Sequence, residues 1–132
     1  MAKAYTLLLL EDEPLILMDL EFAAEDRGCE VIATASCSEA MAAIEARGQT
    51  IDAAILDVSL GQGNTCFPVA HALDQLKIPY LLHSGDLDRL DERIRELKAN
   101  LIAKPAAAEQ VVSAAIIACE ESGAGDLSMP AK

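Results

Sequence analysis

Short apolar runs alternate with amphipathic segments along almost the whole chain. Five runs have the composition of buried strands, over residues 5–10, 30–35, 51–57, 79–83 and 101–103. The segments between them begin at proline or at helix-capping residues, or repeat apolar residues every three or four positions. They predict five helices, over residues 14–27, 38–47, about 66–76, 86–98 and 106–121. Strands that alternate with helices in this way predict an α/β fold, a doubly wound parallel sheet with right-handed crossovers.

Proline, glycine and serine mark the boundaries of these elements. Pro14 suits the first turn of a helix, Gly28 and Gly48 suit helix ends, and Ser36 or Ser38 can cap the second helix. The last residues show no periodicity. We therefore predict one domain, residues 1–122, followed by a flexible C-terminal tail, residues 123–132.

Charge narrows the classes of partner. The chain of 132 residues carries a formal net charge of -12, and no basic cluster offsets it. Such a surface repels nucleic-acid phosphates and anionic lipids, so we expect neither nucleic acid nor membrane as a partner. Proteins are the expected partners.

Targeting signals and cysteine usage bear on location. No apolar run approaches the roughly 20 residues of a membrane-spanning helix, and the first run is too short for a signal peptide. The 4 cysteines are scattered, without the spacing of a zinc site, and are expected in the core in a reducing compartment. We therefore expect a cytoplasmic protein.

Polar residues of particular types follow the predicted strands. Glu11, Asp12 and Glu13 follow the first, Asp57 ends the third, and further polar residues end the last two, Ser84 and Lys104. Ligands of doubly wound sheets bind beyond the carboxyl ends of the strands, so these side chains are candidates for one site. Each alone is commonly a helix cap, a dipole partner or a surface turn. The ordered set is the informative observation.

The chemistry of this set points to phosphoryl transfer. Carboxylates as close as Glu11, Asp12 and Asp57 need protons or a cation between them, and Mg²⁺ (or Mn²⁺) with oxygen ligands is the natural solution. Asp57 is the expected nucleophile, because it ends an apolar strand before a glycine-rich loop. The metal, Lys104 and the Ser84 hydroxyl would then each hold one phosphoryl oxygen.

Four motifs closely resemble the receiver domain of bacterial two-component response regulators. They are LLLLEDEP (7–14), AILDVSL (54–60), LLHSG (81–85) and LIAKP (101–105). The resemblance covers about residues 5–121. It implies a single-domain receiver with a flavodoxin-like sheet of strand order 2-1-3-4-5 and five helices.

The resemblance also implies a role for each site residue. Glu11 and Asp12 occupy the acid-pair positions, and the backbone carbonyl of Ser59 completes the metal shell with Asp57. Asp57 is the phosphoacceptor, with the remaining contacts from the switch hydroxyl and the phosphate-contacting lysine, Ser84 and Lys104. A cis Lys104–Pro105 bond would aim the lysine inward. Ser59 and Asp86 are expected to tune hydrolysis, although Asp86 can instead cap the following helix.

By the same resemblance, the phosphoryl group comes from a histidine kinase or a histidine phosphotransfer protein. The receiver catalyses its own phosphorylation, loses the group slowly and signals by contact with an effector protein. Receivers commonly carry Tyr or Phe where this chain has Leu101, so the usual aromatic toggle is absent and switching needs another device.

Two helices have more apolar residues than one core face requires. In the first, residues 15–18 are all apolar, and one or two of them must face outward, where a kinase helix can dock. In the last, the excess among Val111, Val112, Ile116 and Ile117 predicts a dimer or effector surface, unless the helix is simply well buried. A homodimer is therefore one expected assembly.

Two other classes of function stay open at this point. A phosphoaspartate hydrolase of the haloacid-dehalogenase type also uses a strand-end Asp, but it needs a second Asp where this chain has Ser59. A receiver-like scaffold without phosphorylation is the other alternative, and the intact set of acids, hydroxyl and lysine argues against it. His71 and His83 are too isolated for a catalytic pair or a metal site, and we expect His71 at the surface and His83 half-buried.

Overall fold

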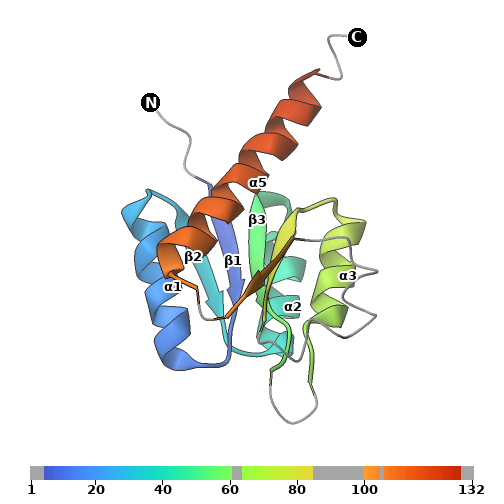
Figure 1. Ribbon diagram of the computed structural model, residues 1–132. Helices are drawn as coiled ribbons and strands as arrows, with labels where there is room; N and C mark the ends of the chain where they lie inside the picture. The colour runs from blue at the N-terminus through green and yellow to red at the C-terminus, as the bar shows by residue number, and fades with distance from the viewer. Residues whose placement is uncertain (1–4, 61–63, 85–99, 105, 129–132) are drawn as a thin grey trace.

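The protein forms a five-stranded parallel sheet with helices on both faces (Figure 1). The structure, a computed structural model, describes residues 5–60, 64–84, 100–104 and 106–128. The strands are β1 (Thr6–Leu10), β2 (Glu30–Thr34), β3 (Ala53–Asp57), β4 (Tyr80–Ser84) and β5 (Asn100–Ala103). All neighbouring pairs are parallel, in the order β2-β1-β3-β4-β5, which confirms the predicted fold class and strand order.

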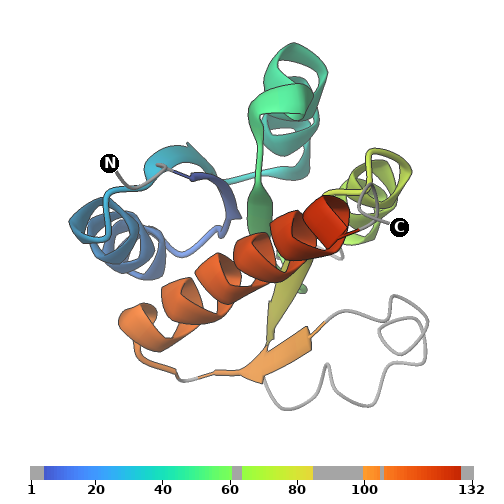
Figure 2. The same ribbon diagram turned by 90° about the horizontal axis from the view of Figure 1, so that it is seen from above.

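Alternation along the central strands divides the core into two layers. Leu8, Leu10 and Leu56 face the cluster under α2 (Cys37–Arg47) and α3 (Phe67–Gln75). Leu7, Leu9 and Ile55 face the opposite cluster, under α1 (Pro14–Asp26) and α5 (Ala108–Ser128). Because β1, β3 and β4 are buried on both faces, they read in the sequence as unbroken apolar runs. Figure 2 shows α1 and α5 on one side of the sheet and α2 and α3 on the other.

The helix termini follow local rules. Ser36 caps α2 by accepting a hydrogen bond from the Glu39 amide at 3.2 Å, and the Glu39 carboxylate accepts one from the Ala35 amide at 2.7 Å. Gly28 follows α1 with φ of +80°, a conformation that glycine adopts without steric cost. The predicted roles of Ser36 and Gly28 are thereby confirmed.

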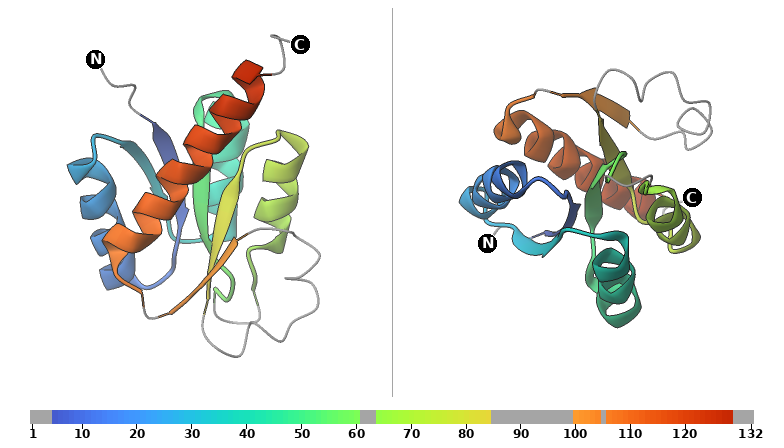
Figure 3. Two further views of the ribbon diagram at one scale, coloured as in Figure 1. Left: turned by 45° about the horizontal axis from the view of Figure 1, so that its top comes forward. Right: turned by 90° about the horizontal axis from the view of Figure 1, so that it is seen from below.

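The last helix is longer than the sequence pattern predicts. We expected it to cover residues 106–121, but α5 begins at Ala108 and runs to Ser128, so most of the predicted tail is helical (Figure 3). Gly123 and Gly125 each lower helix propensity by only about 1 kcal/mol, and proline is not met before Pro130. The predicted helix over residues 86–98 lies outside the described residues. None of the described helices combines the length and apolar character that a membrane crossing requires.

Exposure of the helices corrects one predicted surface and supports another. In α5, Val111, Val112 and Ile116 are buried in the core, so the excess apolar surface predicted there is wrong except at Ile117, which is 52% exposed. In α1, by contrast, Leu15 and Met18 are 75% and 44% exposed, as expected of a helix that presents apolar side chains outward.

The cysteines pack as small apolar residues. Cys29, Cys66 and Cys119 are buried and Cys37 is half-buried, and all of them are free thiols. The expectation of core positions is confirmed for the three buried ones.

Candidate functional site

Two strand ends bring the acidic side chains together. β1 and β3 are neighbours in register, with Leu10 opposite Leu56, so the residues that follow, Glu11 and Asp57, emerge side by side. Ligand oxygens of Glu11, Asp12 and Asp57 all lie within 4.8 Å of one another. Glu11 and Asp57 are buried, at 1% and 3% exposure, while Asp12 is the more accessible member. The predicted acidic cluster is therefore present at the carboxyl edge of the sheet.

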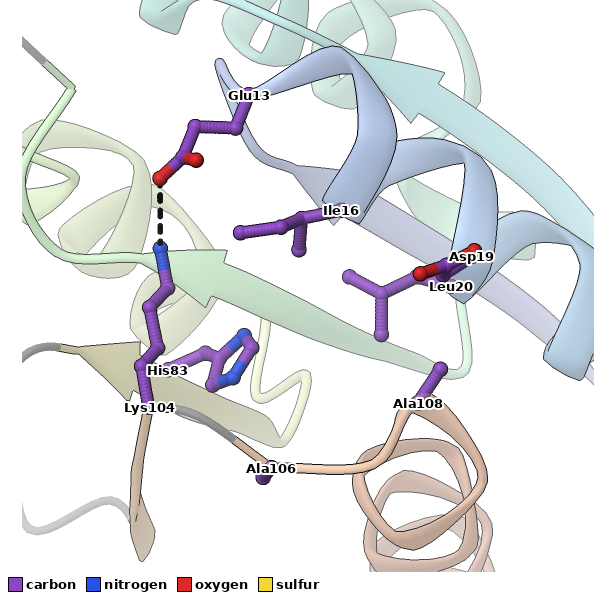
Figure 4. Close-up of a pocket in the computed structure, with 8 residues that line it drawn as sticks. All are labelled: Glu13, Ile16, Asp19, Leu20, His83, Lys104, Ala106 and Ala108. Carbon is purple, nitrogen blue, oxygen red and sulfur yellow. Dashed lines mark ion pairs between the residues drawn. The ribbon is translucent and has the colours of Figure 1, made fainter.

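Lys104 reaches into this cluster from the end of β5. Its Nζ lies 3.2 Å from Glu11 Oε1 and 3.2 Å from Asp57 Oδ1, and its side chain is 18% exposed. The inward orientation predicted for the lysine is correct. A weaker contact of 4.0 Å joins Nζ to Glu13 Oε1, a residue not predicted to take part in the site (Figure 4).

Burial and neighbouring charge control protonation in the cluster. Burial, followed by repulsion from Glu11, raises the pKa of Asp57 to about 8, although Lys104 acts in the opposite direction. Burial alone would lower the pKa of Lys104, but the charges of Asp57 and Glu11 outweigh it and the pKa is raised. The ammonium therefore stays charged, and it only partly compensates the two buried carboxyl groups.

The donor set of the cluster fits a hard divalent cation. It offers carboxylate oxygens only, the ligands that Mg²⁺ prefers, and holds them close enough to share one ion. Glu11 Oε1 is buried and accepts no hydrogen bond within the described part of the chain, although Lys104 lies near it. A buried carboxylate oxygen in that condition is suited to a metal ligand.

Ser84 ends β4 next to the acidic cluster. The register of β3 and β4 places Asp57 opposite His83, so Ser84 lies one residue beyond Asp57 along the strands. The side chain is fully buried, and its hydroxyl has no hydrogen-bond partner among the described residues. The Lys104 amide donates to the Ser84 carbonyl at 2.7 Å, which fixes the two residues relative to each other through the backbone.

The remaining predicted site residues are less closely defined. Ser59 is exposed and pairs with Thr65 in an isolated antiparallel bridge, and its carbonyl as a metal ligand stays a prediction. Leu101, in the position usually aromatic, is half-buried and packs against the core beneath α2 and α3. Asp86 and Pro105, and with the latter the predicted cis bond, lie outside the described residues.

His83 differs from the prediction. We expected a half-buried side chain, but His83 is 3% exposed, because position 83 faces the α1 and α5 layer rather than solvent. Burial, with a smaller effect of the Lys104 charge, lowers the pKa of the imidazole to about 4, so the ring is neutral near pH 7. Neither ring nitrogen has a hydrogen-bond partner among the described residues. His71 is exposed on α3, as predicted.

The His83 ring lines a hollow of about 350 Å³ between α1 and the start of α5 (Figure 4). Its apolar walls are Ile16, Leu20, Ala106 and Ala108. Exposed carboxylates of Glu13 and Asp19 also line it, as does Lys104. The hollow therefore adjoins the acidic cluster and shares Lys104 with it. The sequence gave no signal for it beyond a histidine inside an apolar strand.

Comparisons with known proteins place this geometry among solved structures. Neither the protein-family models nor the curated proteins gave a match. The solution structure of SdrG from Sphingomonas melonis Fr1 is 36% identical, with a TM-score of 0.72, over 90% of this chain and 98% of that one. A putative response regulator from Chloroflexus aurantiacus J-10-fl is 26% identical, with a TM-score of 0.75, over 89% and 99%. A response regulator receiver protein from Sinorhizobium medicae WSM419, at 24% identity over 89% and 96% and a TM-score of 0.76, shares the fold.

Proposed function

Because this chain belongs to the receiver domains of response regulators, the family of two-component signalling, we propose that it is a phosphoacceptor switch that carries a phosphoryl group on Asp57. The donor is a histidine kinase or a histidine phosphotransfer protein. Transfer depends on Mg²⁺ (or Mn²⁺), and the signal passes to an effector by protein contact.

One observation carries the proposal: Lys104 Nζ lies 3.2 Å from both Asp57 and Glu11. A buried ammonium between two carboxyl groups is the arrangement that accepts a further anion, since a phosphoryl oxygen can take up its remaining donors. The acids supply a nucleophile and a site for a cation, and the lysine supplies a contact for the incoming charge. Each component of phosphoryl transfer thus has a residue to supply it.

The transfer step is an in-line displacement. An oxygen of the Asp57 carboxylate forms a bond to phosphorus as the bond from phosphorus to the donor's imidazole nitrogen breaks, and the imidazole leaves with its electron pair. The Lys104 ammonium and the Ser84 hydroxyl donate hydrogen bonds to the phosphoryl oxygens. Mg²⁺, held by Glu11, Asp12, Asp57 and the Ser59 carbonyl, would supply charge neutralisation for those oxygens.

Ionisation of Asp57 is a condition for this step. The pKa of about 8 in the metal-free cluster keeps a large share of the carboxyl group protonated at neutral pH. A cation among the carboxylates favours the charged form, so it prepares the nucleophile as well as the site of the phosphoryl group.

Switching then depends on Ser84. Its hydroxyl is buried without a partner, and a phosphorylated Asp57 would provide an acceptor for it. The family's usual aromatic toggle is replaced by Leu101, so the response travels through β4 and β5 and the backbone bond between Ser84 and Lys104. The exposed Leu15 and Met18 of α1 offer an apolar surface for the phosphodonor protein.

The test is incubation with acetyl phosphate and Mg²⁺, followed by intact-protein mass measurement and peptide mapping. We expect a base-labile gain of one phosphoryl group on Asp57 that requires the divalent cation. Rapid turnover of the phosphodonor without accumulation would instead favour the hydrolase, and no reaction with either acetyl phosphate or a phosphorylated histidine donor would favour the scaffold.

A further inference from the structure

The hollow beside Lys104 contains the imidazole of His83, a buried polar group without a partner in the described part of the chain. A neutral imidazole has one N–H donor and one acceptor nitrogen, and leaving such groups buried and unpaired is costly. Buried polar atoms in folded proteins are nearly always paired, so an unpaired one that faces a hollow marks a position for an incoming group. The phosphoryl chemistry proposed above makes no use of it.

We propose that this hollow is an anchor pocket for a tryptophan or tyrosine side chain of a protein partner, with the ring N–H or O–H donated to His83. The partner presents this side chain from a positively charged segment. The proposal rests on the proposed function only in expecting a protein partner at this edge of the sheet.

The walls and volume of the hollow suit an aromatic ring. Ile16, Leu20 and the alanines at the start of α5 provide apolar contact, and about 350 Å³ falls within the range of small ligand pockets. Tryptophan and tyrosine combine a large apolar body with one polar group, which matches an apolar chamber that contains one unpaired nitrogen acceptor. A purely apolar ring would leave His83 unpaired.

Charge determines what flanks the ring. The exposed carboxylates of Glu13 and Asp19 line the same hollow, and the whole chain carries a net charge of -12. Lysine or arginine next to the anchor would pair with these carboxylates, whereas an acidic segment would be repelled.

The surroundings favour a protein over a free small molecule. Leu15 and Met18, which precede and follow the lining residue Ile16 on α1, are 75% and 44% exposed. The apolar area therefore continues outside the hollow, as around the central anchor of a protein interface. A free ligand would leave this outer area uncovered.

The experiment uses the full-length unphosphorylated protein and three probes. They are the end-blocked peptide Lys-Ala-Trp-Ala-Lys, its twin with Phe in place of Trp, and free tryptamine. Binding is followed by the amide shifts of Ile16, Leu20 and Ala108 in two-dimensional NMR. We expect the Trp peptide to shift these amides and to bind roughly fivefold more tightly than the Phe peptide, the effect of one net hydrogen bond.

Two variants locate the effect. His83→Leu removes both ring nitrogens at similar volume and should bring the Trp and Phe peptides to equal affinity. His71→Leu, an exposed histidine on α3, should leave the difference unchanged. If His83→Leu does not fold, the ratio of the two peptides in the unmodified protein decides the question alone.

Several outcomes would overturn the proposal. They are no shift at millimolar peptide, shifts elsewhere on the protein, or equal affinity for the two peptides in the unmodified protein. Tighter binding of tryptamine than of the Trp peptide would assign the hollow to a free amphiphile instead of a protein. Phosphorylation of Asp57 is measured separately, so failure of labelling beside Trp-specific binding would remove the proposed function and leave the anchor pocket.

Discussion

Two sets of buried polar side chains meet at the carboxyl edge of the sheet, and they are satisfied in opposite ways. Glu11, Asp57 and Lys104 pair with one another, with both carboxylates 3.2 Å from the ammonium. His83 and Ser84, next to them on β4, are equally buried and have no hydrogen-bond partner among the described residues. Charges in a low-dielectric interior require immediate compensation, whereas neutral groups can remain unpaired at about 1–3 kcal/mol each. The ionic set is therefore closed on itself, and the neutral set is available to partners that arrive later.

The largest expected effect comes from removing the nucleophile. Asp57→Asn should reduce phosphoryl incorporation from acetyl phosphate below detection, because the amide cannot attack phosphorus, while the fold is retained. Intact-protein mass measurement checks the labelling and circular dichroism the fold. Asp26→Asn, at an exposed position of α1, is the matched control and should be labelled normally. Labelling of Asp57→Asn at the normal rate would remove Asp57 from its proposed role.

Removing the cation should destabilise the ionic set. Lys104→Met leaves two buried carboxyl groups without their compensating charge, and we expect a loss of about 2–3 kcal/mol in the free energy of unfolding, limited by proton uptake at Asp57. Mg²⁺ should restore more stability to this variant than to the unmodified protein, since the lysine no longer competes for the carboxylates.

Urea unfolding with and without Mg²⁺ measures both effects. Lys77→Met, an exposed lysine, is the control and should change little. Equal stability of Lys104→Met and the unmodified protein would contradict the picture of an ionic set that depends on internal pairing.

The neutral set should reveal itself through pH. Burial lowers the pKa of His83 to about 4, below its ordinary value of 6.5, so the folded state binds this proton less readily than the unfolded state. The contribution to stability is complete above pH 6.5 and is lost as the pH falls toward 4. We expect the unmodified protein to lose about 2–3 kcal/mol over that range relative to His83→Leu.

Other titrating groups contribute to both proteins, including Asp57, whose raised pKa acts with the opposite sign, so the difference isolates the histidine. Unfolding curves at several pH values give the comparison. Parallel pH profiles for the two proteins would show that His83 is not held neutral by the fold.

The smallest stability effect is expected at Ser84. Its hydroxyl has no partner to lose, so Ser84→Ala should change the free energy of unfolding by less than about 0.5 kcal/mol. Thr34→Val is the matched comparison, because the buried Thr34 hydroxyl donates to the Leu9 carbonyl at 2.6 Å, and it should cost about 1 kcal/mol. A cost at Ser84 as large as at Thr34, measured by urea unfolding, would mean that the hydroxyl is paired in solution.

Much of the fold could be read from the sequence because each central strand is buried on both faces. The unbroken apolar run of residues 7–10 has one physical solution in an α/β chain, and the polar residues directly after such runs fall at the sheet edge. The same logic predicted the acidic cluster and the inward Lys104. The end of α5 could not be predicted, because helix propensity at Gly123 and Gly125 is only a weak preference.

His83 was misjudged for a different reason. A polar residue at the end of an apolar strand reads as partly exposed, and its burial depends on how closely α1 and α5 approach β4, which no local pattern encodes. The contact of Glu13 with Lys104 depends in the same way on the path of the chain after β1. Interactions fixed by strand register were predictable, and those fixed by the packing of distant helices were not.

The hydrogen bond from the Lys104 amide to the Ser84 carbonyl has a mechanical consequence. At 2.7 Å it is the final link between β4 and β5 before the strands end, so the two residues share one rigid joint. A pull on the Ser84 side chain is transmitted to the lysine's backbone, and a pull on the lysine returns to Ser84. The two contacts proposed for a phosphoryl group would therefore close in concert, as two jaws on a single hinge.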